Sequence, residues 1–331
     1  MIKIIAEAGV NHNGSLDTAL KMVDAAVRAR ADYIKFQTFK TDSLVTASCR
    51  AAGYQNENAG ETHQASMLRK LELPYADFIT ISDYCREKGI GFLSTPFDFE
   101  SIEFLASLKP DFMKVPSGEI TNLPYLRKIA STHIPVIIST GMCGLPEIEA
   151  ALLPFKAEGY GKESLTLMHC TTQYPTPLCD VNLRAMHTLE EIFGYPAGYS
   201  DHTAGITVAI AAAALGASVI EKHFTLDRNM EGPDHKASLE PSSLGEMVKA
   251  IREVEEALGT PEKRMTESDR KNITAARRSI FAARFIKAGK VIEEADICAK
   301  RPGNGLSPMM WDKVAGSVAK RDFLPDEAIE I

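Results

Sequence analysis

Eight short apolar segments, each followed by a stretch with helical periodicity, constrain the fold of this chain more than any other feature. Strands that alternate with helices pair in parallel, and eight such units over about 250 residues are typical of a (β/α)8 barrel. A doubly wound open sheet is the alternative, but no glycine-rich dinucleotide-binding turn is present. The sequence therefore predicts an α/β fold of the TIM-barrel type. The expected strands are Ile2–Ala8, Tyr33–Thr38, Gly91–Thr95, Phe112–Val115, Val136–Thr140, Leu165–Cys170, Gly198–Ser200 and Val219–Thr225.

Helices are expected in the intervals between these strands, and one connection is much longer than the others. Residues Phe39–Pro74 are polar and far exceed the usual connection of about two to six residues. We expect this segment to have no regular structure and to form either a lid over the site or a disordered excursion. The predicted helices are Leu16–Ala29, Tyr75–Lys88, Ser101–Ser107, Leu123–Ala130, Pro146–Glu158, Leu183–Phe193, Ile206–Leu215 and Leu244–Leu258.

The character of the sequence changes after the last predicted helix. Residues 1–259 are expected to form the barrel domain, and the polar stretch 260–274 a linker or an isolated helix. Residues 275–331 read as short strands broken by glycine turns, which predicts a small β-rich domain. A domain of this size has a marginal core by itself, so we expect it to dock onto another surface.

Composition excludes several classes of partner. The net charge is −7, from 44 acidic and 37 basic residues, which gives no general attraction to nucleic acid or to an anionic membrane. The six cysteines form no CxxC pair, as is typical of reduced thiols. Met1 leads directly into strand-like sequence, so no signal peptide is expected, and the longest apolar stretch is far shorter than the roughly 20 residues that span a bilayer. These features predict a cytoplasmic protein.

Two histidines stand at the ends of the last two predicted strands. His202 follows the seventh strand and His223 ends the eighth. In a barrel of this type the chemistry lies at the carboxyl ends of the strands, and neutral imidazole is the commonest metal ligand. The pair predicts half of a catalytic metal site, with positions left for substrate and water. The alternative for either histidine alone is an ordinary hydrogen-bonded group at the barrel rim.

Lysines and carboxylates occupy other strand ends. Lys35, two residues before Gln37 and on the same face, and Lys114 both point inward in the predicted barrel. A buried ammonium group is costly unless it is paired or faces a ligand, so these lysines predict a clamp for a small dianion or trianion. Ion pairs with Glu7 or Glu119 are the alternative.

The hydroxyl groups of Ser117 and Ser139 stand at turns beside these lysines, where they would add hydrogen bonds to an anion. Glu7 and Glu119 are candidate proton-transfer groups, or else partners in rim salt bridges. Asp234, after the eighth strand, would orient a histidine, contact substrate, or simply make a turn beside Pro233. Glu221 also stands at the end of the eighth strand, and the pattern gives it no role.

Ten motifs in order along the chain resemble those of the bacterial sialic acid synthases. They are EAGVNHNG, KFQTF, STPFD, KVPSGE, STGM, HCTTQYPTP, SDHT, EKHFTLD, GPDHKASLEP and RPGNG. The resemblance implies a TIM barrel followed by an antifreeze-like (SAF) domain, in a homodimer with a swapped C-terminal domain. It also implies condensation of phosphoenolpyruvate with N-acetylmannosamine and water to N-acetylneuraminate and phosphate.

The same resemblance implies roles for individual residues. His202 and His223 would hold a divalent metal, with manganese expected first and magnesium or cobalt as alternatives. Phosphoenolpyruvate would contact Lys35, Lys114, Ser117 and Ser139. Catalytic acids would be Glu7, Glu119 and Asp234. The sugar would contact Gln37, Tyr174 and Arg301, the last supplied by the partner subunit.

Other activities remain open at this point. A synthase of N,N'-diacetyllegionaminate would use 2,4-diacetamido-2,4,6-trideoxymannose through the same chemistry. A sialic acid 9-phosphate synthase would need an additional basic pocket for the sugar phosphate. A metallohydrolase would carry an HxH pair on the first strand, which this sequence lacks, and a protein that only binds ice or sugar would not need the strand-end lysines, glutamates and histidines.

Overall fold

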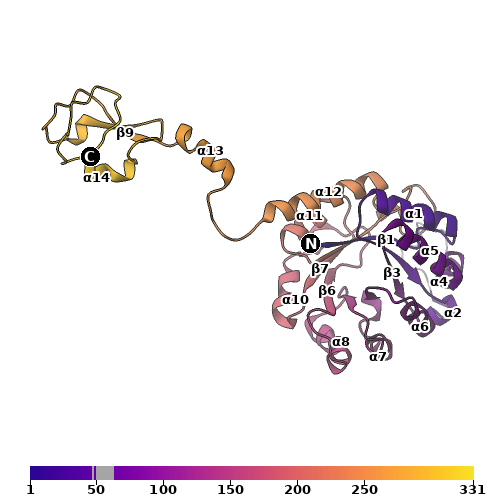
Figure 1. Ribbon diagram of the computed structural model, residues 1–331. Coiled ribbons are helices and arrows are strands. Elements are labelled where there is room, and N and C mark those ends of the chain that lie inside the picture. Colours follow the sequence, from indigo (N-terminus) through magenta and orange to yellow (C-terminus); the bar gives the residue numbers. More distant parts are fainter. Residues whose placement is uncertain (47, 50–62) are drawn as a thin grey trace. The chain divides into compact units, whose positions relative to one another are not determined.

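The computed structural model describes residues 1–46, 48–49 and 63–331. The chain divides into two compact units, residues 1–259 and residues 260–331 (Figure 1). Each unit has its own core.

The first unit is a nearly closed barrel of eight parallel strands, so the predicted TIM barrel is confirmed. The hydrogen-bonded order is β3-β2-β1-β8-β7-β6-β5-β4, and β3 and β4 lie next to each other where the circle closes. The strands lie within about two residues of the predicted bounds. They are β1 (Lys3–Gly9), β2 (Tyr33–Thr38), β3 (Gly91–Pro96), β4 (Met113–Val115), β5 (Val136–Ser139), β6 (Leu165–Cys170), β7 (Ala197–Asp201) and β8 (Val219–His223).

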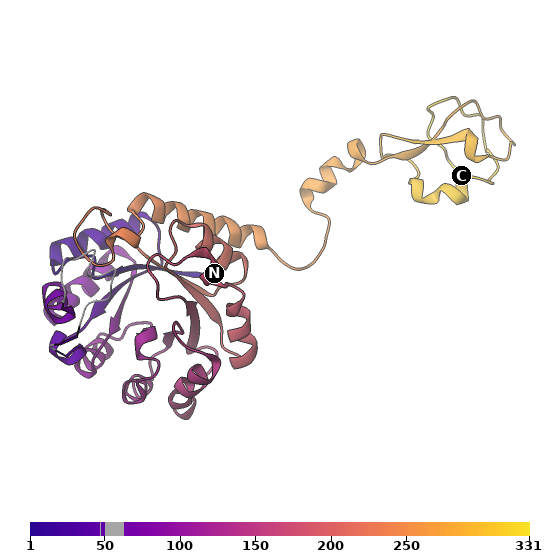
Figure 2. The same cartoon turned by 180° about the vertical axis from the view of Figure 1, so that it is seen from behind.

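Helices surround these strands in both views (Figures 1 and 2). Apolar residues on the outward face of the strands, such as Ile4, Ile34 and Tyr199, form one core cluster with the helices. Because this contact buries one stripe of each helix, the helical periodicity in the sequence is easily recognised. The helices are α1 (Leu16–Arg28), α5 (Tyr75–Lys88), α6 (Phe99–Ser107), α7 (Leu123–Ala130), α8 (Leu145–Ala157), α9 (Leu178–Val181), α10 (Ala185–Phe193), α11 (Thr207–Ala214) and α12 (Pro241–Leu258).

A layer of apolar side chains fills the barrel interior below the site. It consists of Ile5, Leu93, Ile137, Met168 and Val219, which form a separate buried cluster. Successive residues of a strand point to opposite faces, so the next inward residue on each strand stands two positions further along. Those next residues are Glu7, Thr95, Ser139, Cys170 and Glu221. The apolar layer therefore supports a polar layer at the carboxyl end of the barrel.

One charged pair lies on the outward side of the barrel, where the sequence patterns predict none. Lys222 and Asp201 are almost fully buried and lie 2.8 Å apart. Lys222 also donates to the carbonyl oxygen of Thr203, and Asp201 accepts from the backbone N–H of the same residue. The pair ties β8 to the turn after β7, and so holds the segment that carries His202.

The segment between β2 and α5 contains regular structure, so the expectation of a structureless connection is wrong for its described part. Two helices, α2 (Thr41–Leu44) and α4 (Gln64–Leu71), occur there. They contribute to an apolar cluster, called the insertion cluster below, which includes Val10, Phe39, Leu44, Val45, Met67, Leu68, Leu71 and Phe97. Contact with the barrel rim explains the helices. Met67, Leu68 and Leu71 of α4 are buried in the cluster, and Leu44 of α2 packs against it. Residues 47 and 50–62 of the expected lid lie outside the described part.

The second unit is small and contains short strands, as the sequence predicts. It begins with α13 (Glu267–Ala276), and its two paired strands, β9 (Ser279–Ala282) and β10 (Ile297–Lys300), are antiparallel. The short helix α14 (Trp311–Val314) follows. Its core includes Ile280, Ile292 and Phe323. Within the described residues of both units, no helix has the length and apolarity that crossing a membrane requires.

Candidate active site

A cavity of about 600 Å³ opens at the carboxyl ends of the barrel strands. It brings together nearly all of the residues that the sequence marks as candidates, from the strands or from the segments that follow them, with β3 as the exception. These are Glu7, Lys35, Gln37, Lys114, Ser117, Glu119, Ser139, Tyr174, His202, His223 and Asp234. Arg301 belongs to the second unit, where its side chain is exposed and donates to the carbonyl oxygen of Ala276.

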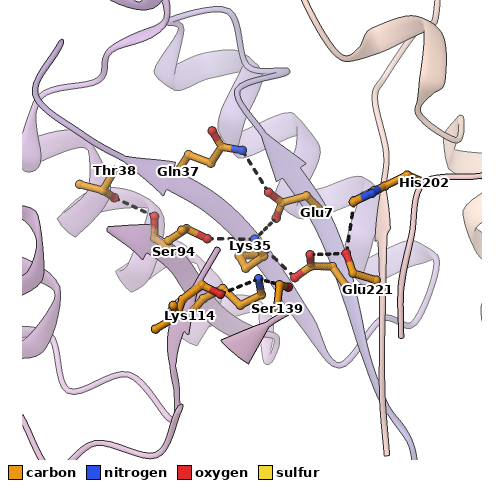
Figure 3. A network of polar contacts seen from close by, with 12 residues as sticks. Glu7, Lys35, Gln37, Thr38, Ser94, Lys114, Ser139, His202 and Glu221 are labelled. Atoms are coloured by element: carbon orange, nitrogen blue, oxygen red, sulfur yellow. Dashed lines mark hydrogen bonds and ion pairs between the residues drawn. The ribbon is translucent and has the colours of Figure 1, made fainter. Parts of the chain in front are cut away.

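Four buried charged side chains form the floor of this cavity (Figure 3). The ammonium group of Lys35 lies 3.0 Å from a carboxylate oxygen of Glu7 and 3.4 Å from one of Glu221. Lys114 donates to the hydroxyl group of Ser139 at 2.7 Å. Among the described residues, Lys114 has no carboxylate within 4.0 Å. The ion pair considered for Lys35 therefore exists, and Lys114 is the cation that faces the cavity without one.

Burial and mutual attraction separate the pKa values of the floor residues. Burial raises the pKa of Glu7 to about 7, although Lys35 opposes this shift. Burial acts in the same direction on Glu221, but the charges of Lys114 and Lys35 outweigh it and lower its pKa to about 2. For Lys35, the carboxylates of Glu221 and Glu7 overcome burial and raise the pKa, whereas burial lowers the pKa of Lys114. Near neutral pH Glu221 is therefore ionised and Glu7 is partly protonated. The two carboxyl groups then carry less negative charge than two ionised ones would, which favours binding of an anion beside the lysines.

The two histidines lie side by side, with ring centroids 5.3 Å apart. The Nδ1 atom of His202 bonds to the carbonyl oxygen of Thr171, which can only accept, so Nδ1 carries the proton and Nε2 is left with its lone pair. Burial lowers the pKa of His202 to about 4 and that of His223 well below its usual value. Both rings are therefore neutral at physiological pH.

The donor set of these histidines fits a divalent metal in part. The Nδ1 atom of the buried His223 has no hydrogen-bond partner among the described residues. Across that same part of the chain, no three His, Cys, Asp or Glu side chains are grouped so that they could hold a metal ion. Two neutral imidazoles would thus supply the protein ligands, and the remaining positions would be open to substrate or water.

Tyr174 contacts both histidines. Its ring lies 4.1 Å from that of His202, and its hydroxyl group lies 3.0 Å from the Nε2 atom of His202. The ring also packs edge-on against His223, at 5.5 Å between centroids. Tyr174 thus borders the histidine pair in the lining of the cavity, where a ligand of the histidines would meet it.

Asp234 is held in place by the turn that follows β1. Asn13 donates to the carbonyl oxygen of Glu231 at 2.9 Å, and its side-chain oxygen lies 3.2 Å from the Nε2 atom of His235. A Cβ atom on Gly232 would come within 2.6 Å of the His235 ring, so this loop needs glycine there. Ser15 caps α1, and Asn13 instead fixes the loop that carries Asp234. Burial raises the pKa of Asp234 to about 6.

Ser117 and Glu119 lie in the short 3-10 turn after β4. The hydroxyl group of Ser117 accepts from the backbone N–H of Gly141 at 2.9 Å, and a Cβ atom on Gly141 would come within 2.8 Å of that hydroxyl. Glu119 accepts a hydrogen bond from Asn122 at 2.7 Å. The glycine after β5 thus allows the two turns to approach closely enough to share one site.

Glu221 is the floor residue whose role the sequence patterns do not supply. Besides Lys35 it contacts Ser200, whose hydroxyl group donates to it at 2.9 Å. Its position two residues before His223 on the same strand is the signal that places it in the site. The alternation alone could not show that the negative charge of Glu221 offsets much of the cost of burying Lys35 and Lys114.

Comparisons with known proteins extend over nearly the whole chain. Residues 22–263 match the NeuB family and residues 277–330 match the SAF domain. An N,N'-diacetyllegionaminic acid synthase of Campylobacter jejuni is 46% identical over 98% of this chain and 98% of that protein. One from Legionella pneumophila is 46% identical over 95% of this chain and 89% of its own length. The crystal structure of an N-acetylneuraminic acid synthetase from Leptospira borgpetersenii has a TM-score of 0.72 and 34% identity, and covers 82% of this chain and 90% of that one.

We expect the substitution Glu7→Gln to change how folding stability depends on pH. The carboxyl group keeps its proton up to about pH 7 in the folded chain, but loses it near pH 4.5 when exposed. Between these values the folded state binds more protons. The contribution of this group to the free energy of unfolding is therefore fully present below pH 4.5. It is lost as the pH rises toward 7, by on the order of 3 kcal/mol. Glutamine has no such proton, so the variant should lack this decline.

Denaturant unfolding of both proteins at a series of pH values measures the difference. Glu253→Gln, which changes an exposed carboxylate of α12, is the control and should follow the unsubstituted protein. If Glu7→Gln also follows it between pH 4.5 and 7, the carboxyl group of Glu7 is ionised across this range and the assignment of its pKa is wrong.

Proposed function

We propose, because this chain belongs to the NeuB family, that it condenses phosphoenolpyruvate with an open-chain amino sugar and water to form a sugar acid and phosphate. One observation carries the proposal. A single cavity holds two buried lysines and two neutral histidines, in a chain that is 46% identical over nearly its whole length to sugar-acid synthases. The lysines suit a small multiply charged anion, and the histidines suit a metal that binds an aldehyde.

The sugar we propose is 2,4-diacetamido-2,4,6-trideoxymannose, which would make the product N,N'-diacetyllegionaminate. The two synthases at 46% identity bear that product's name, whereas the sialic acid synthetase has 34% identity. The first expectation, N-acetylmannosamine, is therefore not confirmed and becomes the second candidate. A sugar 9-phosphate product finds less support, because Lys35 and Lys114 are the only Lys or Arg side chains among the described residues that line the cavity.

In this reaction the floor residues bind and orient phosphoenolpyruvate. Lys35 and Lys114 would neutralise its phosphate and carboxylate, and the hydroxyl groups of Ser117 and Ser139 would add hydrogen bonds. The substrate's CH₂ carbon forms the new bond to the aldehyde carbon, and the aldehyde oxygen takes up a proton. Holding the two substrates together supplies a large share of the rate, because a reaction between bound groups avoids the entropy cost of an encounter.

Water then adds to the former enol carbon and loses a proton to a nearby carboxylate. Glu7, with a pKa of about 7, is suited to accept and return a proton at neutral pH. Glu119 lines the same cavity and is the second candidate. The tetrahedral hemiketal phosphate that results breaks its carbon–oxygen bond to phosphate, and the ketone of the sugar acid forms.

A divalent metal, manganese before magnesium or cobalt, would be held by His202 and His223. When bound, it would polarise the aldehyde as a Lewis acid. Tyr174, Gln37 and Asp234 would surround the sugar. Asp234 is held rigidly by the Asn13 loop, and Gln37 lies beside Glu7, with 3.5 Å between its amide nitrogen and the carboxylate.

The proposed activity predicts phosphate release that depends on the sugar. With phosphoenolpyruvate and Mn²⁺, we expect the highest kcat/KM for 2,4-diacetamido-2,4,6-trideoxymannose, a lower value for N-acetylmannosamine and the lowest for its 6-phosphate. A coupled phosphate assay measures all three, and mass spectrometry identifies each product. Higher turnover of N-acetylmannosamine would establish the second candidate instead, and no turnover of any sugar by metal-loaded protein would refute the proposed reaction.

The metal assignment predicts a defect in metal binding as well as in activity. His223→Ala removes one of two proposed ligands, so its dissociation constant for Mn²⁺, measured by titration calorimetry, should rise at least tenfold, as is typical of altered metal shells. Phosphate release should then fall below detection after chelation and remain there when Mn²⁺ is restored. His187→Ala, on an exposed position of α10, is the matched control. Unchanged Mn²⁺ affinity in His223→Ala would place the metal elsewhere.

The proposed role of Arg301 predicts an effect confined to the sugar. If its guanidinium group reaches the site of a partner subunit, Arg301→Ala should raise the KM for the amino sugar at least tenfold and leave the KM for phosphoenolpyruvate nearly unchanged. Steady-state kinetics with each substrate varied in turn measures both constants. Light scattering of the same variant shows whether it is still a dimer. Equal changes in both constants in an intact dimer would contradict this role.

A further inference from the structure

One side of the cavity changes from charged to apolar between its floor and its rim. Lys35 and Gln37, two apart on β2, point to the same side, and Phe39, just after the end of β2, lines the cavity with them. On β3, Thr95 is followed in the same way by Phe97. All of these residues line the cavity. The side formed by β1, β2 and β3 thus carries polar groups at the floor and aromatic rings above them.

The insertion cluster extends this apolar side. Leu44 and Val45, at the end of α2, and Met67 and Leu68, in α4, all line the cavity. Leu44, Val45 and Phe97 are half-buried, so part of each side chain is exposed where a ligand would lie. None of these side chains has a hydrogen-bonding group, apart from the weak acceptor in the thioether of Met67.

The polar residues that this segment adds to the lining do not change its character. Thr46, Cys49 and Gln64 also border the cavity. The thiol group of Cys49 donates to the amide oxygen of Gln64 at 3.1 Å, so these two side chains contact each other. As far as the described residues form it, the surface above the floor on the side of β1 to β3 is therefore mainly apolar.

The positions of the phosphoenolpyruvate residues and of the histidines indicate which part of the sugar would reach the apolar side of the cavity. Of the four phosphoenolpyruvate residues, Lys114, Ser117 and Ser139 come from β4, β5 and the turn after β4, and Lys35 lies on β2 at the floor, below the aromatic rings of that side. His202 follows β7 and His223 ends β8. The aldehyde carbon of the sugar, C1, would lie between the histidines and phosphoenolpyruvate. The other end of the sugar, from C4 to C6, would then point toward the remaining sector. That sector is the one the insertion cluster covers.

We propose that the insertion cluster is a specificity subsite that receives the methyl group at C6 and the acetamido methyl at C4 of the sugar, and that it selects a 6-deoxy substrate. The inference rests on the proposed function, because it places the sugar through the condensation reaction. A 6-hydroxyl group against this surface would lose its hydrogen bonds to water without replacement. An apolar pocket rejects an added hydroxyl group by up to about a hundredfold.

The test separates the C4 and C6 substituents. Four sugars form a complete set: N-acetylmannosamine, its 6-deoxy form, 2,4-diacetamido-2,4-dideoxymannose and 2,4-diacetamido-2,4,6-trideoxymannose. For each, kcat/KM is measured by phosphate release with the full chain and Mn²⁺. The unsubstituted protein should prefer the 6-deoxy member of both pairs by about tenfold or more.

Two substitutions in the cluster should reduce that preference. Val45→Thr keeps the shape of the side chain and adds a hydroxyl group, and Leu44→Asn adds an amide. Each should lower the 6-deoxy to 6-hydroxy ratio of kcat/KM about threefold to tenfold, while Val45→Ile should keep it. Val27→Thr, the same exchange at a half-buried position of α1 outside the cavity, should leave the ratio and the activity unchanged. Melting temperatures of all variants show that each one is folded.

The outcomes for the proposed function and for the subsite are different. If one or more sugars are condensed but the ratio stays near one, or does not respond to Val45→Thr and Leu44→Asn, the subsite is overturned and the proposed function stands. If no sugar is condensed, both are overturned. A preference for 6-deoxy sugars that falls in the two cluster variants and persists in Val27→Thr supports the subsite.

Discussion

Two ammonium groups and two carboxylates buried together at the mouth of the barrel are the constraint around which the rest of this site is arranged. The carboxylates of Glu221 and Glu7 act against burial on the pKa of both lysines, and for Lys35 they outweigh it. The register of β1 with β2 and β8 places Glu7 level with Lys35 and with His223. The apolar layer below excludes water from the barrel interior, so the attraction between these charges is weakly screened. The same arrangement leaves Glu7 with a pKa near 7.

Much of the barrel and its site could be predicted from the sequence because both depend on short-range periodicity. Alternation in the strands indicates which residues face inward, and parallel strands bring their carboxyl ends to one rim. The sequence alone therefore predicts that Lys35, Lys114, His202 and His223 lie together. Helix bounds followed from the same logic, since each helix buries one stripe against the outer face of the sheet.

What the sequence did not predict depends on contacts between distant residues. The outward Lys222 follows no pattern of its own, and only the approach of Asp201 explains its burial. The partners of Asn13 lie more than 200 positions away, so the neighbouring sequence does not indicate its role. The helices α2 and α4 are short and sit in a polar segment, so their apolar contacts become visible only beside Val10, Phe39 and Phe97. Long-range pairing of this kind leaves no periodic signal.

The strand period of two has a consequence for how such a chain can diverge. Adding one residue inside β2 would turn its inward side chains toward the helices and remove Lys35 from the floor. Residues added after Phe39 leave that alternation untouched, and this is where the long segment before α5 begins. Length and composition are therefore free to vary at the rim while the floor stays constant. A lineage of such chains could exchange one sugar for another many times without rebuilding the chemistry beneath.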